Sequence, residues 1–272
     1  MRQGLDYAWG YHGGAPAVFK KAGYSFVVRY LSGGRTKDLT LHEAQELRAV
    51  GLDIALVWEA ASASRALAGY GAGTTDARLA VRQATSLGMP EGRPIYFAVD
   101  FDATSAQTRG PVREYFRGIA AVLPLSQIGV YAGLRPLFYL FDQGLIKWGW
   151  QTYAWSGGTW DGRAQLHQYR NGVWVAGIDC DKDRAITEDF GQWGYEEDDM
   201  VDPKVQAQLD RIEDKVGYAQ NRALSISFKL GLQVLEDHGG TSEQLINYKK
   251  AALAAINRER RENGRTDMAT DL

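Results

Sequence analysis

Hydrophobic and polar positions along the first half of the chain follow two patterns, one typical of strands and one typical of helices. Short apolar runs rich in β-branched and aromatic residues predict strands over residues 4–9, 24–31, 52–59, 94–99 and 127–132. Amphipathic stretches between and after them predict helices over residues 16–22, 40–50, 75–87, 105–123 and 135–141. Strands and helices that alternate in this way are typical of parallel strands joined by crossover helices.

The alternation of strands and helices stops near residue 150. Three further strands are predicted close together, over residues 150–155, 164–169 and 173–178, with no helical pattern between them. Asn171 and Gly172 form a hairpin signal. Five β/α units followed by three bare strands predict an α/β fold, an irregular, TIM-like (β/α)-barrel. An open doubly wound sheet is the alternative, but no glycine-rich phosphate loop follows the first strand.

A different region follows this barrel, which is predicted to span residues 1–190. Residues 191–203 are acidic and predict a linker. Within residues 204–272, apolar positions recur at alternating spacings of four and three, the pattern of a coiled coil. This C-terminal helical/coiled-coil region could fold back as a hairpin, or residues 205–235 could join copies into a homo-oligomer. The pattern leaves both open.

Composition narrows the classes of function. The chain has 272 residues and a formal net charge of −2, so nothing indicates a nucleic-acid partner. Its single cysteine, Cys180, excludes an internal disulfide and a cysteine metal cage. No apolar run approaches the roughly 20 residues of a membrane span. The first residues lack the apolar core of a signal peptide, so we expect a protein made in the cytoplasm without its own export signal.

Carboxylates follow several of the predicted strands. Asp100 and Asp102 come after residues 94–99, and they share one side of the sheet if the chain is still extended there. Two acids side by side raise one of the two pKa values, which provides an acid and a base from one residue type. The alternative is that one caps the next helix and the other is solvated. Asp6 and Asp181 reach the same rim, where barrels of this class hold their chemistry.

Paired carboxylates ringed by aromatic residues suggest glycoside cleavage. Tyr30, Trp58 and Trp155 are candidate platforms for sugar rings, or core residues at the barrel end. Other candidate substrate-binding residues at this rim are Arg29, Tyr131 and Gln168. Arg29 is expected to pair with a rim carboxylate, and Gln168 to bond a sugar N-acetyl group or the backbone. The acids could also bind Ca²⁺ or Mg²⁺, but no metal or cofactor is predicted.

Four motifs carry a family resemblance: Gly4-Leu-Asp-Tyr7, Ile95-Tyr-Phe-Ala-Val-Asp-Phe-Asp102, Gly129-Val-Tyr131, and Gln168-Tyr169 followed by Gly177-Ile-Asp-Cys-Asp-Lys-Asp183. Together they resemble glycoside hydrolase family 25, and more closely its sister, the glycoside-hydrolase-like family labelled domain of unknown function 1906. The resemblance covers residues 1 to about 190. It implies an irregular barrel and a muramidase that cuts peptidoglycan between N-acetylmuramic acid and N-acetylglucosamine.

The resemblance also implies roles for four catalytic residues. Asp6 matches the first-strand aspartate, Asp100 the first acid of the Asp-x-Glu motif, and Asp181 the last-strand aspartate. Asp102 stands where family 25 has its glutamate general acid. Because aspartate is one methylene shorter, its proton sits roughly 1.5 Å further back, and such a displacement can cost about 100-fold in rate.

The sequence leaves three possible functions open. The first is a phage lysin without a signal peptide, released by a holin or carried in a virion, whose partner is the peptidoglycan glycan chain. The second is a non-catalytic glycan-binding or structural module of a phage virion or tail, oligomerised by its C-terminal helices. The third is a metal-assisted hydrolase on the same barrel, whose signature would be sensitivity to EDTA.

Overall fold

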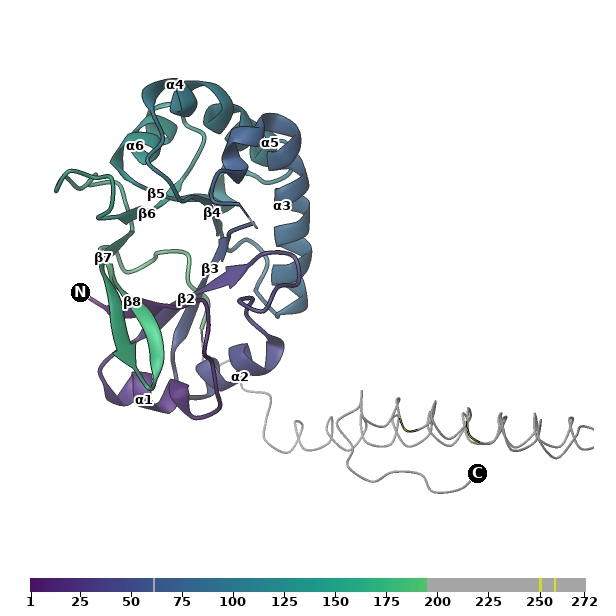
Figure 1. Cartoon of the computed structure of the whole chain (residues 1–272), viewed down its shortest axis with the longest axis vertical. Helices are drawn as coiled ribbons and strands as arrows, with labels where there is room; N and C mark the ends of the chain where they lie inside the picture. The colour runs from purple at the N-terminus through teal and green to yellow at the C-terminus, as the bar shows by residue number, and fades with distance from the viewer. Residues whose placement is uncertain (61, 195–249, 251–256, 258–272) are drawn as a thin grey trace, which may run out of the picture. The chain divides into compact units, whose positions relative to one another are not determined.

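A computed structural model describes residues 1–60 and 62–194, together with residues 250 and 257. The chain divides into two units, Met1–Tyr195 and Glu196–Leu272. In the first unit, strands β1 to β8 form a closed barrel in sequence order (Figure 1), which confirms the expected mixed α/β barrel. The predicted helical hairpin or coiled coil lies outside the described residues, so it stays a prediction.

The first part of the barrel alternates strands and helices. Its elements are β1 (Gln3–Asp6), α1 (Ala15–Lys21), β2 (Phe26–Leu31), α2 (Leu41–Ala49), β3 (Asp53–Trp58), η1 (Arg65–Ala68), α3 (Gly69–Ser86), β4 (Ile95–Val99), α4 (Ser105–Gln107), η2 (Thr108–Val112), α5 (Arg113–Ala120), η3 (Leu125–Gln127), β5 (Ile128–Ala132) and α6 (Leu134–Asp142). Strands β1 to β7 pair in parallel. The carboxyl ends of the parallel strands therefore meet at one mouth.

The last three strands follow one another without a helix. They are β6 (Trp148–Thr152), β7 (Leu166–Val175) and β8 (Ile178–Ala185). The predicted strand over residues 173–178 is wrong, because β7 continues past Asn171 and Gly172 with two shifts of register. The hairpin turns instead at Ala176 and Gly177, whose φ angles of 53° and 74° are those that a tight hairpin turn requires.

Strand β8 is antiparallel to both of its neighbours, β7 and β1. Asp181 therefore lies inside a strand rather than beyond the end of one, and it is directly opposite Asp6. Side chains of β8 alternate between the two faces, so Asp181 and Asp183 share a face.

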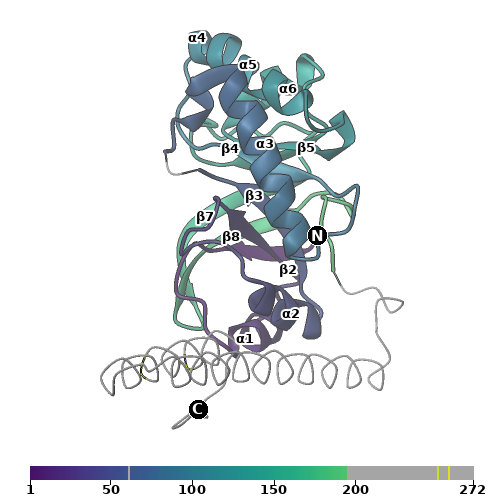
Figure 2. The same ribbon diagram turned by 90° about the vertical axis from the view of Figure 1, so that its right-hand side faces the viewer.

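Alternation along the strands separates two apolar clusters. The cluster inside the barrel consists mainly of strand residues with their side chains turned inward, such as Val28, Val57 and Trp150, and also includes Phe190. The intervening strand residues pack outward against the helices. Figure 2 shows α3 running along the outside of the barrel, where it packs against α5 and against β2 and β3.

Two tryptophans that lie outside the strands pack on the barrel. Trp160 stacks on His167 of β7 with ring centroids 4.0 Å apart, and so covers the outer face of the bare strands. At the opposite end from the mouth, Trp193 is buried and its backbone pairs with Ile54. The first residues of the predicted linker, 191–194, are therefore packed on the barrel.

Candidate active site

Gln168 joins two carboxylates at the mouth of the barrel. Its Nε2 donates to Asp6 Oδ2 at 2.9 Å and to Asp181 Oδ2 at 3.2 Å. Its Oε1 accepts hydrogen bonds from Tyr131 at 2.9 Å and from Thr152 at 2.8 Å. These donors fix the orientation of the amide, so its two N–H bonds point to the acids. The structure thus brings together four predicted site residues, which are Asp6, Tyr131, Gln168 and Asp181.

Asp6 is a buried acid with an unusual affinity for protons. Tyr30 donates to its Oδ1 at 2.9 Å. Burial, assisted by the charge of Asp181, raises the pKa of Asp6 to about 6, although the hydrogen bonds from Gln168 and Tyr30 oppose the rise. Near neutral pH, Asp6 can therefore exchange a proton.

Asp183 is a third acid of this group, and it was not among the predicted site residues. Trp150 donates its indole N–H to Asp183 Oδ1 at 2.8 Å. Burial, followed by the charge of Asp6, raises the pKa of Asp183 well above its ordinary value. The rise favours the protonated form of Asp183, in which its carboxyl group could donate to Asp6. The signal that could have found it is its spacing of two from Asp181, once β8 is placed correctly.

Asp100 lies on the other side of the mouth, directly after β4, and is half-buried. It makes no hydrogen bond or ion pair within the described part of the chain. Burial raises the pKa of Asp100, and the charges of Glu59 and Asp181 add to the rise while Lys37 opposes it. Its carboxyl group is thus free to meet a substrate, and the raised pKa favours the protonated form.

Asp102 has a different environment from Asp100. Its side chain is 63% exposed and forms an ion pair with Arg135 at 3.2 Å. The expectation that the two acids share one side required an extended chain. The strand ends at Val99, and a turn follows in which the Ala103 N–H donates to the Phe101 carbonyl at 2.8 Å.

Arg29 does not reach the mouth. It is buried on the outward face of β2, where its Nε donates to Glu43 of α2 at 2.5 Å. The predicted pairing with a rim carboxylate is wrong, because Arg29 and Tyr30 are successive residues of a strand and must point to opposite faces. The Glu43 carboxylate also accepts a hydrogen bond from Tyr7.

The three predicted aromatic platforms lie in three different places. Tyr30 points into the barrel and bonds Asp6. Trp58 is buried in the helix layer, so it is the core residue that the sequence offered as the alternative. Trp155 is partly exposed and lines a separate pocket beside α6.

A cavity of about 340 Å³ opens beside Asp6, Tyr30 and Asp181. Two tryptophans with large exposed fractions line it, Trp9 at 60% and Trp174 at 72%. Sequence reasoning missed both; the available signal was an aromatic residue in a glycine-rich loop and another beside a hairpin turn. Exposed rings beside buried acids are suited to stacking against sugars while a proton is transferred.

The described residues contain no cluster of three or more histidine, cysteine, aspartate or glutamate side chains arranged to hold a metal ion. None of the helices in this part of the chain is long and apolar enough to cross a membrane.

Residues 17–185 match the family model described as the Rv2525c-like, glycoside hydrolase-like domain. The chain belongs to this family. Within the Rv2525c-like family, the chain is 30% identical over 202 residues to Rv2525c of Mycobacterium tuberculosis, covering 70% of this chain and 82% of that protein. The name of that relative marks it as a candidate peptidoglycan hydrolase.

Solved structures agree with the barrel. The crystal structure of Rv2525c in complex with L-tartrate aligns with a TM-score of 0.67 and 28% identity, covering 71% of this chain and 99% of that one. An uncharacterised protein of B. stearothermophilus aligns with a TM-score of 0.52 and 19% identity, covering 68% of this chain and 96% of that one. The second likeness shows the fold alone.

The comparison corrects one expectation. The crystallised M. tuberculosis relative is described as Tat-secreted, which contradicts the predicted cytoplasmic product without an export signal. The predicted release by a holin, or transport in a virion, depended on the same expectation and is withdrawn with it. The resemblance to a glycoside-hydrolase-like family is confirmed at the level of the Rv2525c-like family, whereas the closer links to family 25 and to phage lysins stay predictions.

Proposed function

We propose that this Rv2525c-like domain hydrolyses the glycan strand of peptidoglycan between N-acetylmuramic acid and N-acetylglucosamine. The proposal depends on one observation above the others. Asp100 is half-buried, has no partner among the described side chains and has a raised pKa, to which Asp181 contributes across the mouth. A pair of carboxyl groups at one barrel mouth is the kind of arrangement that glycosidic hydrolysis uses. The name of the M. tuberculosis relative supports the choice of polymer.

In this proposal Asp100 is the general acid and protonates the glycosidic oxygen. A proton donor must keep its proton near the working pH and must be free to approach the substrate. Asp100 has no partner among the described side chains, and its raised pKa shifts it toward the form that keeps the proton. Asp102 is exposed and held by Arg135, so we assign it to the edge of the substrate site rather than to proton transfer.

Asp181 is the second carboxyl group and stabilises the positive charge that develops on the sugar. Its Oδ1 accepts from the Gly172 N–H at 3.0 Å, and its Oδ2 accepts from Gln168. These contacts hold the carboxylate in place. Asp6, behind it, tunes the local charge because its own pKa of about 6 lies within the working range.

Trp9 and Trp174 supply the apolar faces against which sugar rings stack. Both line the cavity that also contains Asp6 and Asp181. A glycan bound there lies beside the acids. Since its relative is exported, we also propose that the protein acts outside the cytoplasmic membrane.

The test is product analysis of purified peptidoglycan incubated with the protein, with new reducing ends identified by mass. We expect Asp100→Asn to reduce their release by at least about 100-fold, and Asp102→Asn to retain most of it. Similar release from Asp100→Asn and the wild type would contradict the assignment of the acid. Wall binding without any new reducing ends would favour the non-catalytic glycan-binding module instead.

A further inference from the structure

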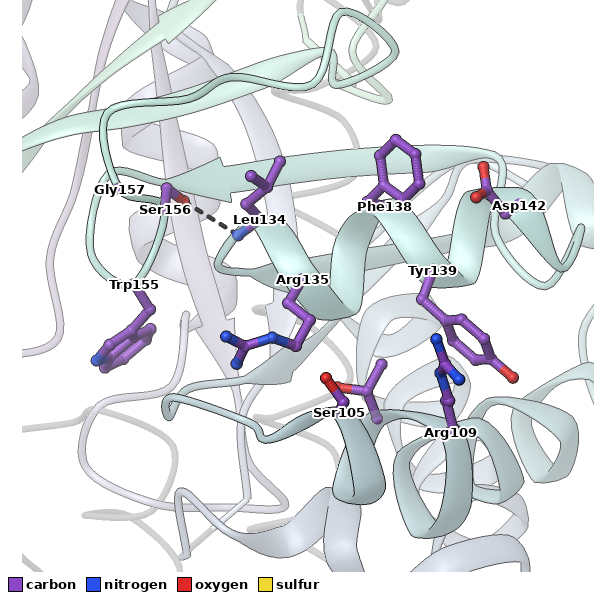
Figure 3. Close-up of a pocket in the computed structure, with 11 residues that line it drawn as sticks. Ser105, Arg109, Leu134, Arg135, Phe138, Tyr139, Asp142, Trp155, Ser156 and Gly157 are labelled. Atoms are coloured by element: carbon purple, nitrogen blue, oxygen red, sulfur yellow. Dashed lines mark hydrogen bonds between the residues drawn. The ribbon is translucent and has the colours of Figure 1, made fainter.

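A second pocket, of about 560 Å³, lies between α6 and the segment around Ser105. Figure 3 shows Arg135 and Arg109 extending into this space from two different elements. Leu134, Phe138, Tyr139 and Trp155 give it apolar walls. Its volume lies within the range of about 300–1,000 Å³ that is usual for small-ligand sites. None of the roles proposed above uses it.

The charges around this pocket leave one cation uncompensated. Asp142 is paired with Arg163 at 2.8 Å, and Arg135 is paired with Asp102 at 3.2 Å. Arg109 lines the pocket, is exposed, and has no hydrogen bond or ion pair to any described residue. The pocket therefore offers one free guanidinium group, which is suited to binding a carboxylate in two-point geometry.

Thr108 is a second polar group that lacks a partner. It lines the same pocket, it is 1% exposed, and its hydroxyl makes no hydrogen bond within the described structure. It begins the segment Thr108–Val112, in which the chain kinks at Gly110, directly before Pro111. A buried hydroxyl without a partner is costly. A ligand that accepts or donates a hydrogen bond here would satisfy it.

The pocket adjoins the mouth of the barrel. Arg135, on its wall, bonds Asp102 and also donates to the carbonyl of Ala103 at 2.6 Å. Asp102 follows the proposed general acid, Asp100, by two residues. A substituent that branches from a glycan bound at the mouth therefore has a short path to the pocket.

We infer that this pocket binds the stem peptide of peptidoglycan, with Arg109 receiving a peptide carboxylate. The inference builds on the proposed function, because the stem peptide branches from the N-acetylmuramic acid of the glycan. Thr108 bonds the peptide backbone, and the aromatic walls contact its aliphatic parts. The pocket thus selects a peptide-bearing glycan over a bare one.

Calorimetric titration tests this with a synthetic stem tetrapeptide and with the same peptide after its carboxylates are amidated. We expect Arg109→Gln to weaken binding of the carboxylate form about tenfold or more, since a charge-assisted hydrogen bond is lost. The wild type should also bind the amidated peptide about tenfold more weakly. Arg117→Gln is the matched control; this arginine pairs with Glu114 on α5 and does not line the pocket.

Thr108→Val separates binding from folding. Its hydroxyl has no partner in the free protein, so its loss should leave the thermal midpoint unchanged or raised while peptide binding weakens severalfold. Binding of both peptides with equal affinity, or wild-type affinity in Arg109→Gln, would overturn the inference. L-tartrate that binds as tightly as the tetrapeptide would also overturn it, because the pocket would then be a general anion site.

These outcomes are distinct from a failure of the proposed function. Peptide binding that depends on Arg109, in a protein that releases no reducing ends, would leave the pocket assigned and the hydrolase proposal rejected. Wall hydrolysis that depends on Asp100, with no peptide binding, would reject the pocket alone.

Discussion

Asp6 and Asp183 interact inside the barrel, where burial and the charge of Asp6 raise the pKa of Asp183 and favour its protonated form. The indole of Trp150 holds the opposite side of Asp183. Because an asparagine amide has the shape of a protonated carboxyl group and can also donate, Asp183→Asn should keep the fold, with a free energy of unfolding within about 1 kcal/mol of the wild type. Asp183→Leu removes both contacts and should cost about 1–3 kcal/mol. Urea denaturation at pH 7 measures both variants.

The two Asp183 variants would be equally destabilised if this acid were ionised. In that case neither asparagine nor leucine could replace its charge, and the view that Asp183 favours its protonated form would be wrong.

The pH dependence of stability should reflect Asp6. Its folded-state pKa of about 6 lies above its ordinary value of 3.8. Its contribution is therefore complete below about pH 4 and is lost as the pH rises through 6, by roughly 2–3 kcal/mol. Denaturant titrations of the wild type and of Asp6→Asn between pH 4 and 7 measure this. The wild type should lose more stability over that range than the variant, whereas parallel curves would refute the shift.

Arg29 and Glu43 form a buried ion pair away from the mouth. Removing one partner leaves a buried charge uncompensated, so Arg29→Met should destabilise the protein by about 3–5 kcal/mol. Replacing both, in Arg29→Met with Glu43→Leu, should recover a large part of that loss. A double-mutant cycle measured by chemical denaturation gives the coupling. If Arg29→Met and the double variant lost the same amount of stability, the two charges would not be coupled. The side chains would then contribute through packing alone.

Trp174 should affect substrate binding but not folding. Its ring is 72% exposed and lines the cavity beside Asp181. We expect Trp174→Ala to raise the KM for soluble glycan fragments about fivefold or more, from the loss of ring stacking, with kcat and the thermal midpoint little changed. Trp160→Ala is a useful contrast, because Trp160 covers His167 and its loss should lower the midpoint. A KM unchanged in Trp174→Ala would remove this ring from the substrate site.

The sequence was sufficient for the barrel and for part of its mouth. Periodic apolar runs located the first six strands to within three residues at each end, and the strand-end positions of Asp6 and Asp100 followed from them. Strand β7 runs six residues past its predicted end at residue 169. The last strand was misplaced because Asn171-Gly172 is a stronger local turn signal than Ala176-Gly177. Long-range pairing of β8 with β1 decided the turn, and a local pattern does not contain that information.

Other errors concerned the direction in which side chains point and their exposure. Arg29 and Tyr30 were both assigned to the mouth, although neighbouring positions of a strand cannot share a face. Trp9 and Trp174 were missed because their exposure depends on loops that periodicity does not describe. Asp183 needed the true extent of β8 before its spacing from Asp181 became informative.

The hairpin of β7 and β8 carries an exposed aromatic ring and an acid of the same cavity on one piece of chain. Trp174 lies near its tip, and Asp181 is anchored further back, where β8 closes the barrel against β1. Paired insertions at Ala176 and Gly177 would lengthen the tip without altering the register at Asp181. Insertions at the tip could therefore change which ligand this edge contacts while the acids stay where they are.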